Sequence, residues 1–320
     1  MRPWNIAHRG GAQLRPENTL AAFACAVAKG CDGAELDVQL SRDGEVVVFH
    51  DYRLKPDICR DEGRWLSPPT PRLKDLSLAE LRRYDVGRAD PQSAYARAHP
   101  GVAWQDGECI PTLDEVVAVA KTAPAPFRLF VELKTCFSDR DASALPEDLA
   151  ERAVAVLTAH GYLDRTIFVG FDWPGLLHAK KIAPSAQCWF TTLPQSWFRD
   201  GVPPPEDDPP SEAALQMLRY WAREGISPWA GGFDAVKHGG SIVAAIRAAG
   251  GDGWFPARTD IDAQTVAEAR GLGLKVGAWT VNDPAEMRAL ATRGLDAICT
   301  DRPDLLAKFA HNPSNSAVER

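Results

Sequence analysis

Two carboxylates in the segment GAELDVQL (33–40), Glu35 and Asp37, are spaced so that they share one face of a β-strand. The alternate positions of the segment are alanine or aliphatic, which predicts that the opposite face is buried in a core. Burying two neighbouring carboxylates is costly unless a cation offsets their charge. The spacing therefore predicts a cation-binding position on this strand.

A histidine follows these acids across a predicted hairpin. The residues RDGE contain Asp43-Gly44, a favoured two-residue turn. A turn that pairs Arg42 with Glu45 sets Asp37 opposite His50, and paired residues lie on the same face of a sheet. We therefore expect Glu35, Asp37 and His50 to form one cluster.

Further polar side chains end two other apolar runs. His8 and Arg9 follow the run NIA, and Glu132 and Lys134 end the run FRLFVELK. Carboxylates without a cysteine cluster suit Mg²⁺ or Ca²⁺ better than zinc.

The basic residues complete this chemistry. Arg9 and Lys134 offer donors to an anion such as phosphate. Histidines titrate near neutral pH and can act as base and acid. Together with a metal, these groups suit the cleavage of a phosphodiester.

Strands must bring these residues together, and the chain contains eight apolar segments, nearly all followed by a helical pattern. Eight such units predict a closed (β/α)₈ TIM barrel, whose strands end at the one face where sites form. A doubly wound open sheet is the alternative. The predicted strands are 5–8, 33–40, 127–134, 166–171, 186–192, 253–256, 274–281 and 296–300.

Two segments interrupt this repeat within a single domain spanning 1–320. Residues 52–111 predict a small insertion after the second-strand hairpin, which we expect to overhang one end of the barrel and to restrict the substrate. Residues 193–250 begin with a proline-rich acidic stretch and predict an extended elaboration of loops and helices. A long loop in a compact domain is more often functional than idle.

Composition excludes several classes of protein. The chain has 320 residues, 45% of them hydrophobic and 25% charged, with a formal net charge of −7. This charge argues against nucleic-acid partners and against adhesion to an anionic membrane. Seven scattered cysteines without a CxxC pair favour reduced thiols, and no apolar run is long enough for a membrane anchor. We expect a cytoplasmic protein, and the sequence leaves its oligomeric state open.

The motifs taken together resemble those of the glycerophosphodiester phosphodiesterase family, among the phosphatidylinositol-phospholipase-C-like barrels. The resemblance rests on five segments in family order: AHRGG…PENTLAAF, GAELDVQLSRDGEVVVFHD, VELK, AWTVND and ICTDRPD. It implies metal-dependent hydrolysis of glycerophosphodiesters to sn-glycerol 3-phosphate and an alcohol. The cofactor implied is one divalent cation, Mg²⁺ or Ca²⁺, with Mn²⁺ as a further option.

The resemblance also implies roles for individual residues. It makes His8 and His50 catalytic, and our interpretation of the pair takes His8 as base and His50 as acid. It assigns the metal to Glu35, Asp37 and Glu132, the phosphate to Arg9 and Lys134, and the glycerol to Trp279. Glu17 of PENT is expected to orient Arg9 or a histidine. The alternative is that Glu17 only stabilises the start of a helix, where the helix dipole favours an acid. Asn18 is expected to be structural.

Other functions remain open at this stage. The chain could instead be a lysophospholipase D or a sugar-phosphodiester hydrolase, which use the same set of metal-binding, phosphate-binding and histidine residues. A third alternative is a non-catalytic phosphate-binding barrel. Segments 193–250 and 253–256 depart from the family pattern, so the resemblance does not define the alcohol group.

Overall fold

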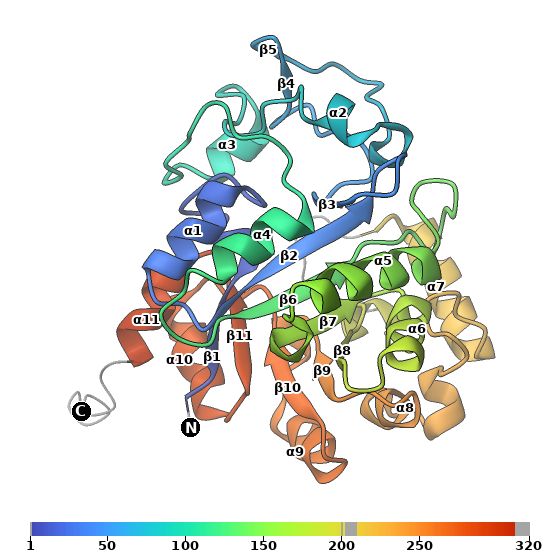
Figure 1. Cartoon of the computed structure of the whole chain (residues 1–320). Coiled ribbons are helices and arrows are strands. Elements are labelled where there is room, and N and C mark those ends of the chain that lie inside the picture. The colour runs from blue at the N-terminus through green and yellow to red at the C-terminus, as the bar shows by residue number, and fades with distance from the viewer. Residues whose placement is uncertain (1, 200, 202–209, 311–320) are drawn as a thin grey trace.

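The computed structural model describes residues 2–199, 201 and 210–310, and within these ranges eight parallel strands form a closed barrel (Figure 1). The neighbours run in the order β1-β11-β10-β9-β8-β7-β6-β2, and the pairing of β1 with β2 closes the ring. All eight predicted strands and the predicted TIM barrel are confirmed. The strands are β1 (Trp4–Ala7), β2 (Gly33–Leu40), β6 (Arg128–Leu133), β7 (Thr166–Gly170), β8 (Gln187–Thr191), β9 (Gly253–Phe255), β10 (Lys275–Ala278) and β11 (Ala297–Thr300).

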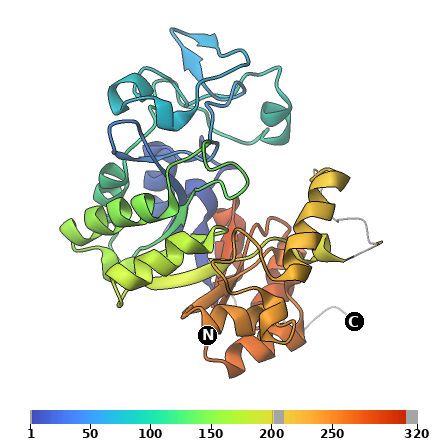
Figure 2. The same ribbon diagram turned by 90° about the vertical axis from the view of Figure 1, so that its right-hand side faces the viewer.

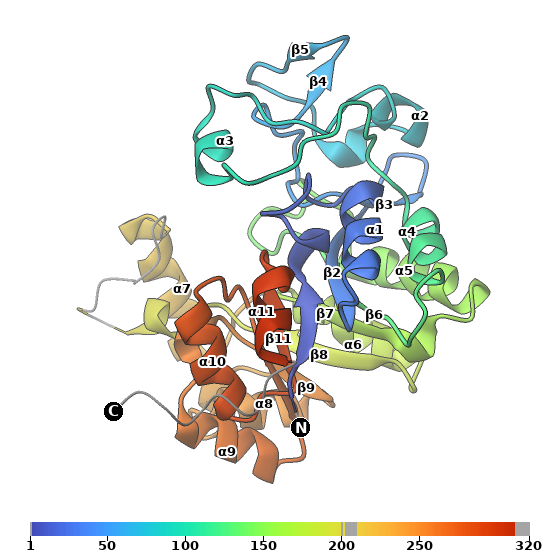
Figure 3. The same cartoon turned by 90° about the vertical axis from the view of Figure 1, so that its left-hand side faces the viewer.

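A helix follows each barrel strand and covers its outer face (Figures 1 and 3). Several of these helices begin where the sequence supplies a cap. Thr19 accepts from the backbone of α1, Thr112 and Glu115 form a capping box on α4, and Asp283 caps α10 ahead of Pro284. The helices are α1 (Leu20–Ala28), α4 (Leu113–Ala120), α5 (Pro146–Ala159), α6 (Trp173–Ile182), α8 (Ile242–Ala248), α9 (Ala263–Gly271), α10 (Pro284–Thr292) and α11 (Pro303–Ala310).

Aromatic side chains fill the barrel interior. Trp189 stacks on Trp4 with ring centroids 5.9 Å apart and meets Phe130 edge-on at 5.2 Å, while Phe130 also contacts Phe255. Small and aliphatic residues of neighbouring strands complete this inner cluster. The alternate side chains of the strands face the surrounding helices in a larger core. The barrel interior is therefore filled by apolar side chains, and the polar groups lie at the carboxyl ends of the strands.

The hairpin after β2 differs from its prediction by one residue. β3 (Val46–Val48) pairs Leu40 with Val46, whereas the expected turn paired Leu40 with Val47. The loop has three residues rather than two, because Ser41 pairs with Glu45 and Gly44 adopts a φ of 81°. This shift sets Phe49, not His50, opposite Asp37.

Residues 52–111 lie beyond the carboxyl end of β2 and contain a small hairpin and two short helices (Figure 1). Their apolar side chains, among them Leu54, Leu73 and Leu81, pack with Val47 and Phe49 into a cluster of their own. The elements are β4 (Arg60–Asp61), β5 (Arg64–Trp65), α2 (Leu78–Leu81) and α3 (Ala94–Ala98).

Residues 193–250 follow β8 and include the barrel helix α8. Ahead of α8 they add α7 (Glu212–Glu224), which lies to one side of the barrel (Figure 2). Much of the proline-rich stretch, 200 and 202–209, lies outside the described residues, as does the polar tail 311–320. Across the ranges that the structure describes, no helix has both the length and the apolar character needed to cross a membrane.

Candidate active site

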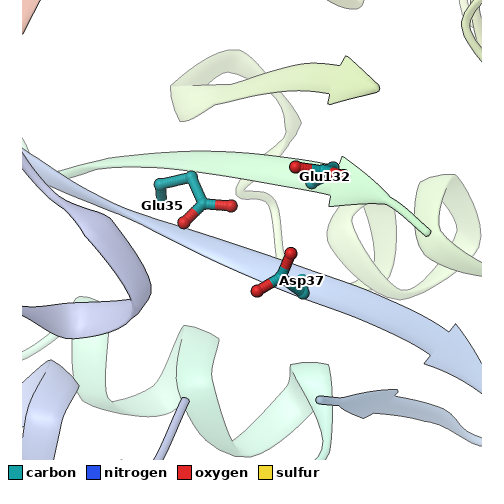
Figure 4. Close-up of side chains that lie close together, drawn as sticks. All are labelled: Glu35, Asp37 and Glu132. Atoms are coloured by element: carbon teal, nitrogen blue, oxygen red, sulfur yellow. The ribbon is translucent and has the colours of Figure 1, made fainter. Parts of the chain in front are cut away.

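Three carboxylates converge on adjacent strands at the carboxyl end of the barrel (Figure 4). Glu35 and Asp37 both belong to β2 and are buried, as their spacing predicted. Glu132 belongs to the neighbouring strand β6, where the parallel register places it directly beside Asp37. One oxygen atom from each of the three groups lies within 4.8 Å of the others.

The electrostatics of this cluster suit a bound cation. Burial and the neighbouring Asp37 carboxylate raise the pKa of Glu35 to about 8. Burial also opposes ionisation of Asp37, but nearby His50, Arg9 and Lys134 outweigh it and lower the Asp37 pKa. A set of three hard oxygen ligands with unfavourable mutual repulsion fits a divalent cation such as Mg²⁺ or Ca²⁺.

His8 lies directly after β1, in the short 3₁₀ turn η1 (His8–Gly10). Its Nδ1 atom is 2.6 Å from Oδ1 of Asp301, and Asn282 donates to the other oxygen of Asp301 at 2.6 Å. Its Nε2 atom faces the acid cluster, 3.8 Å from Oε2 of Glu35. Burial opposes protonation of His8, but the Asp301 carboxylate outweighs it and raises the His8 pKa.

Asp301 and Asn282 were not predicted as site residues. Both lie in quoted motifs, WTVND and CTDRPD, and Asp301 directly follows β11. A polar residue immediately after a barrel strand belongs to the face where sites form, and this position was the signal available in the sequence.

Arg9 adopts a strained backbone conformation, with φ 50° and ψ 33°. In this conformation its backbone N–H donates to Oε2 of Glu35 at 3.0 Å. Its guanidinium donates to Oε1 of Glu17 at 2.9 Å and approaches Oδ2 of Asp37 at 3.3 Å. The next residue must be glycine, because a Cβ on Gly10 would come within 2.6 Å of the Ala22 side chain.

Glu17 and Asn18 both support this arrangement. Glu17 accepts a hydrogen bond from the guanidinium of Arg9 and another from the Tyr95 hydroxyl at 2.5 Å. Asn18, expected to be structural, donates from its side chain to Oδ2 of Asp37 at 2.8 Å. Tyr95 belongs to the segment 52–111, so that segment contacts the site through Glu17.

His50 reaches the site although the hairpin register differs from the prediction. The chain leaves β3 after Val48, and the side chain of Gln39 donates to the backbone carbonyls of Phe49 at 2.8 Å and Asp51 at 3.0 Å. These bonds hold the bend that turns His50 toward the barrel axis. Burial, together with the positive charges of Arg9 and Lys134, lowers the His50 pKa.

Seven of the nine predicted site residues line a cavity of about 180 Å³ at the carboxyl ends of the strands, whereas Asp37 and Glu17 are not among its lining residues. Lys134 lies at its edge, with its Nζ atom 2.9 Å from Glu132 and 3.7 Å from Asp37. Trp279 presents its ring, because its indole N–H donates to the backbone carbonyl of Phe255 at 3.0 Å. The cavity is lined by His8, Arg9, Glu35, His50, Glu132, Lys134, Phe171, Thr191, Phe255, Trp279, Thr280 and Cys299.

A (β/α)₈ barrel with acids, histidines and cations around one cavity at the strand ends defines the class of barrel phosphodiesterases. The family model of the glycerophosphoryl diester phosphodiesterase family matches residues 8–305. The chain therefore belongs to the glycerophosphoryl diester phosphodiesterase family and is an enzyme of that class.

Individual relatives agree with this assignment. A glycerophosphodiester phosphodiesterase of Caldanaerobacter subterraneus is 26% identical over 306 residues, which are 96% of this chain and 97% of the relative. A solved structure from Silicibacter pomeroyi, described as a putative glycerophosphoryl diester phosphodiesterase, has a TM-score of 0.78 at 29% identity and covers 96% of this chain and 92% of its own. A phosphodiesterase from Oleispira antarctica, solved with its product sn-glycerol-3-phosphate, has a TM-score of 0.68 at 26% identity and covers 97% of this chain and 98% of its own.

Proposed function

We propose that this chain hydrolyses glycerophosphodiesters to sn-glycerol 3-phosphate and an alcohol, with one divalent cation and two catalytic histidines. The observation that carries the proposal is one cavity of about 180 Å³, which is lined by both histidines, by the basic residues Arg9 and Lys134, and by two of the three acids, Glu35 and Glu132. The sn-glycerol-3-phosphate in the Oleispira antarctica relative supports the same product here.

Arg9 and Lys134 bind the phosphoryl oxygens. Both are buried cations whose partners are the acids of the cluster, so their charges are held in place before substrate arrives. Such preorganised donors stabilise negative charge that develops during displacement at phosphorus. Trp279 contributes an apolar ring surface for the carbon skeleton of the glycerol.

His8 acts as the general base. Its Nδ1 atom is committed to Asp301, which leaves Nε2 free to take a proton from the nucleophile, either water or the glycerol hydroxyl next to the phosphoester. A carboxylate on Nδ1 orients the ring and stabilises the imidazolium that forms, as in hydrolases with a histidine–aspartate pair.

His50 acts as the general acid. Burial lowers its pKa, as do the positive charges of Arg9 and Lys134, and a phosphodiester anion bound by these two residues offsets the effect of the charges. Substrate binding therefore favours the protonated His50 that must donate to the departing alkoxide.

Glu35, Asp37 and Glu132 hold the divalent cation. When bound, the cation polarises the phosphoryl oxygens and offsets the negative charge of the transition state. The side chains of Asn18 and Arg9, which contact Asp37, keep these carboxylates in place.

The proposal is tested by assaying a panel of glycerophosphodiesters with chelator-stripped protein to which Mg²⁺, Ca²⁺ or Mn²⁺ is returned. We expect release of sn-glycerol 3-phosphate only after a cation is added. Full activity in excess chelator contradicts the metal assignment. Failure to cleave any member with every cation contradicts the proposed reaction and favours a phosphate-binding barrel.

A further inference from the structure

A second cavity, of about 510 Å³, adjoins the phosphate cavity on the same face of the barrel. The two cavities share a wall, which consists of Glu132, Lys134, Phe171, Trp279 and Thr280. The larger space therefore lies directly beside a group bound at the phosphate position. Its volume lies within the range of about 300–1,000 Å³ that is typical of small-molecule sites.

The larger cavity is lined mainly by apolar side chains. They come from loops after several strands: Phe137, Phe171, Leu193, Pro194, Trp197 and Trp279. Phe171 and Trp279 meet edge-to-face with ring centroids 5.4 Å apart. Because the indole N–H of Trp279 already donates to Phe255, this wall presents carbon surface to the cavity.

The charges around the larger cavity disfavour a cationic head group. Among the described residues that line it, the charged ones are Glu132, Lys134 and Arg258. Glu132 pairs with Lys134 at 2.9 Å, and Arg258 pairs with Glu286 at 2.9 Å. An ammonium group placed here therefore finds no carboxylate that is not already paired with a cation.

We propose that this enzyme acts on glycerophosphodiesters that carry an apolar chain, and that the larger cavity binds that chain. The inference rests on the proposed function, since it concerns a substituent of the same substrate. The chain is either an acyl group on the glycerol or the alkyl part of the departing alcohol. The five lining residues that the two cavities share carry the inference, because they place the larger cavity within reach of a substituent of the molecule bound at the phosphate position.

The test compares two series of soluble substrates. One consists of glycerophosphate esters of straight-chain alcohols from ethanol to octanol, and the other of glycerophosphocholines with a single acyl chain of two to eight carbons. We expect kcat/KM to rise about threefold to fourfold per added methylene in one series, which corresponds to ~0.8 kcal/mol per buried CH₂ group. The series that shows the rise identifies which side of the phosphate carries the chain.

Two phenylalanines provide a matched pair of variants. Phe137 lines the larger cavity, whereas Phe198 lines a neighbouring one, and both rings are half-buried against Trp229. Phe137→Ala should reduce the ratio of the longest to the shortest substrate at least tenfold. Phe198→Ala should keep the ratio of the unmodified protein. Equal loss of the ratio in both variants overturns the assignment of the chain to this cavity.

A pair of isosteric substrates separates an apolar pocket from one that selects an ammonium group. Glycerophosphocholine and its uncharged 3,3-dimethylbutyl counterpart have the same shape, and we expect the uncharged ester to have the higher kcat/KM. Preference for choline, or rates independent of chain length in both series, overturns the inference while the proposed hydrolysis stands. Absence of hydrolysis throughout overturns both.

Discussion

The Nδ1 atom of His8 lies 2.6 Å from Oδ1 of Asp301, although 293 positions separate the two residues in the chain. β1 and β11 are neighbours in the barrel, and their paired ends, Ala7 and Thr300, are followed directly by this histidine and this aspartate (Figure 3). Asn282, in the loop after the neighbouring strand β10, donates to Asp301. A chain of three residues on neighbouring loops thus sets the orientation of one proposed catalytic group.

We expect Asp301→Asn to lower the plateau of kcat/KM by about 10²–10⁴-fold, the range for loss of a general acid–base group. Asp301 raises the His8 pKa, so its removal lowers that pKa and shifts the acid limb of the pH profile to lower pH. The His8 pKa is measured directly by NMR titration. Asp304→Asn is the control, because Asp304 pairs with Arg302. An unchanged plateau and an unchanged His8 pKa in Asp301→Asn contradict the positioning role.

The two histidines should respond differently to the leaving group. Choline leaves as a strongly basic alkoxide that needs a proton, whereas nitrophenolate leaves without one. We expect His50→Ala to slow hydrolysis of glycerophosphocholine about 10²–10⁴-fold more than that of a nitrophenyl glycerophosphodiester. His8→Ala should slow both alike. The reverse pattern shows that His8 is the acid and His50 the base. Equal loss of activity on both substrates in both variants shows that the histidines do not divide these tasks.

Glu132→Gln should weaken cation binding and nearly abolish turnover while the fold is retained. In unmodified protein, a cation at a hundred times its Kd stabilises the folded state by ~2.7 kcal/mol, because it binds only that state. We expect this rise in thermal stability to disappear in Glu132→Gln. Glu151→Gln provides the control, since Glu151 lies on the outer helix α5 and pairs with His178. A cation-dependent shift of equal size in Glu132→Gln shows that the acid cluster is not the metal site.

Tyr95→Phe tests whether residues 52–111 act on the phosphate position. The Tyr95 hydroxyl donates to Glu17, which in turn holds Arg9, so its loss leaves a buried carboxylate oxygen without that donor. We expect binding of sn-glycerol 3-phosphate to weaken about tenfold, within the ~1–3 kcal/mol cost of an unsatisfied buried group. Tyr84→Phe, in the same segment, should bind normally. Unchanged affinity in Tyr95→Phe limits the segment to a role that does not pass through Glu17.

Excision of residues 52–111 tests whether this segment selects among the alcohol groups of the substrate. Tyr52 of this segment lines the larger cavity, and the rest of the lining comes from the end of β6 and from barrel loops. We expect relative rates across the substrate panel to change more than phosphate affinity does. The comparison applies once circular dichroism shows that the barrel has folded, and identical relative rates contradict the prediction.

Short-range patterns in the sequence determined the order of strands and helices in this protein and the strand face that carries its acids. Strand and helix segments were predicted because apolar runs, caps and glycines act within a few residues of one another, and the shared face of Glu35 and Asp37 follows from the period of a strand. The motifs also contain both histidines, the acids Glu35 and Glu132 and the basic residues Arg9 and Lys134, which the structure places around one cavity.

Tertiary structure alone decided how these residues are held. The hairpin register depends on the positive φ of Gly44, and the bend at His50 depends on the side chain of Gln39; the RDGE pattern reveals neither. The contacts of Asp301 with His8 and of Tyr95 with Glu17 join residues far apart in the chain. The larger cavity forms from loops after several strands, so its shape depends on barrel closure and packing rather than on any single segment.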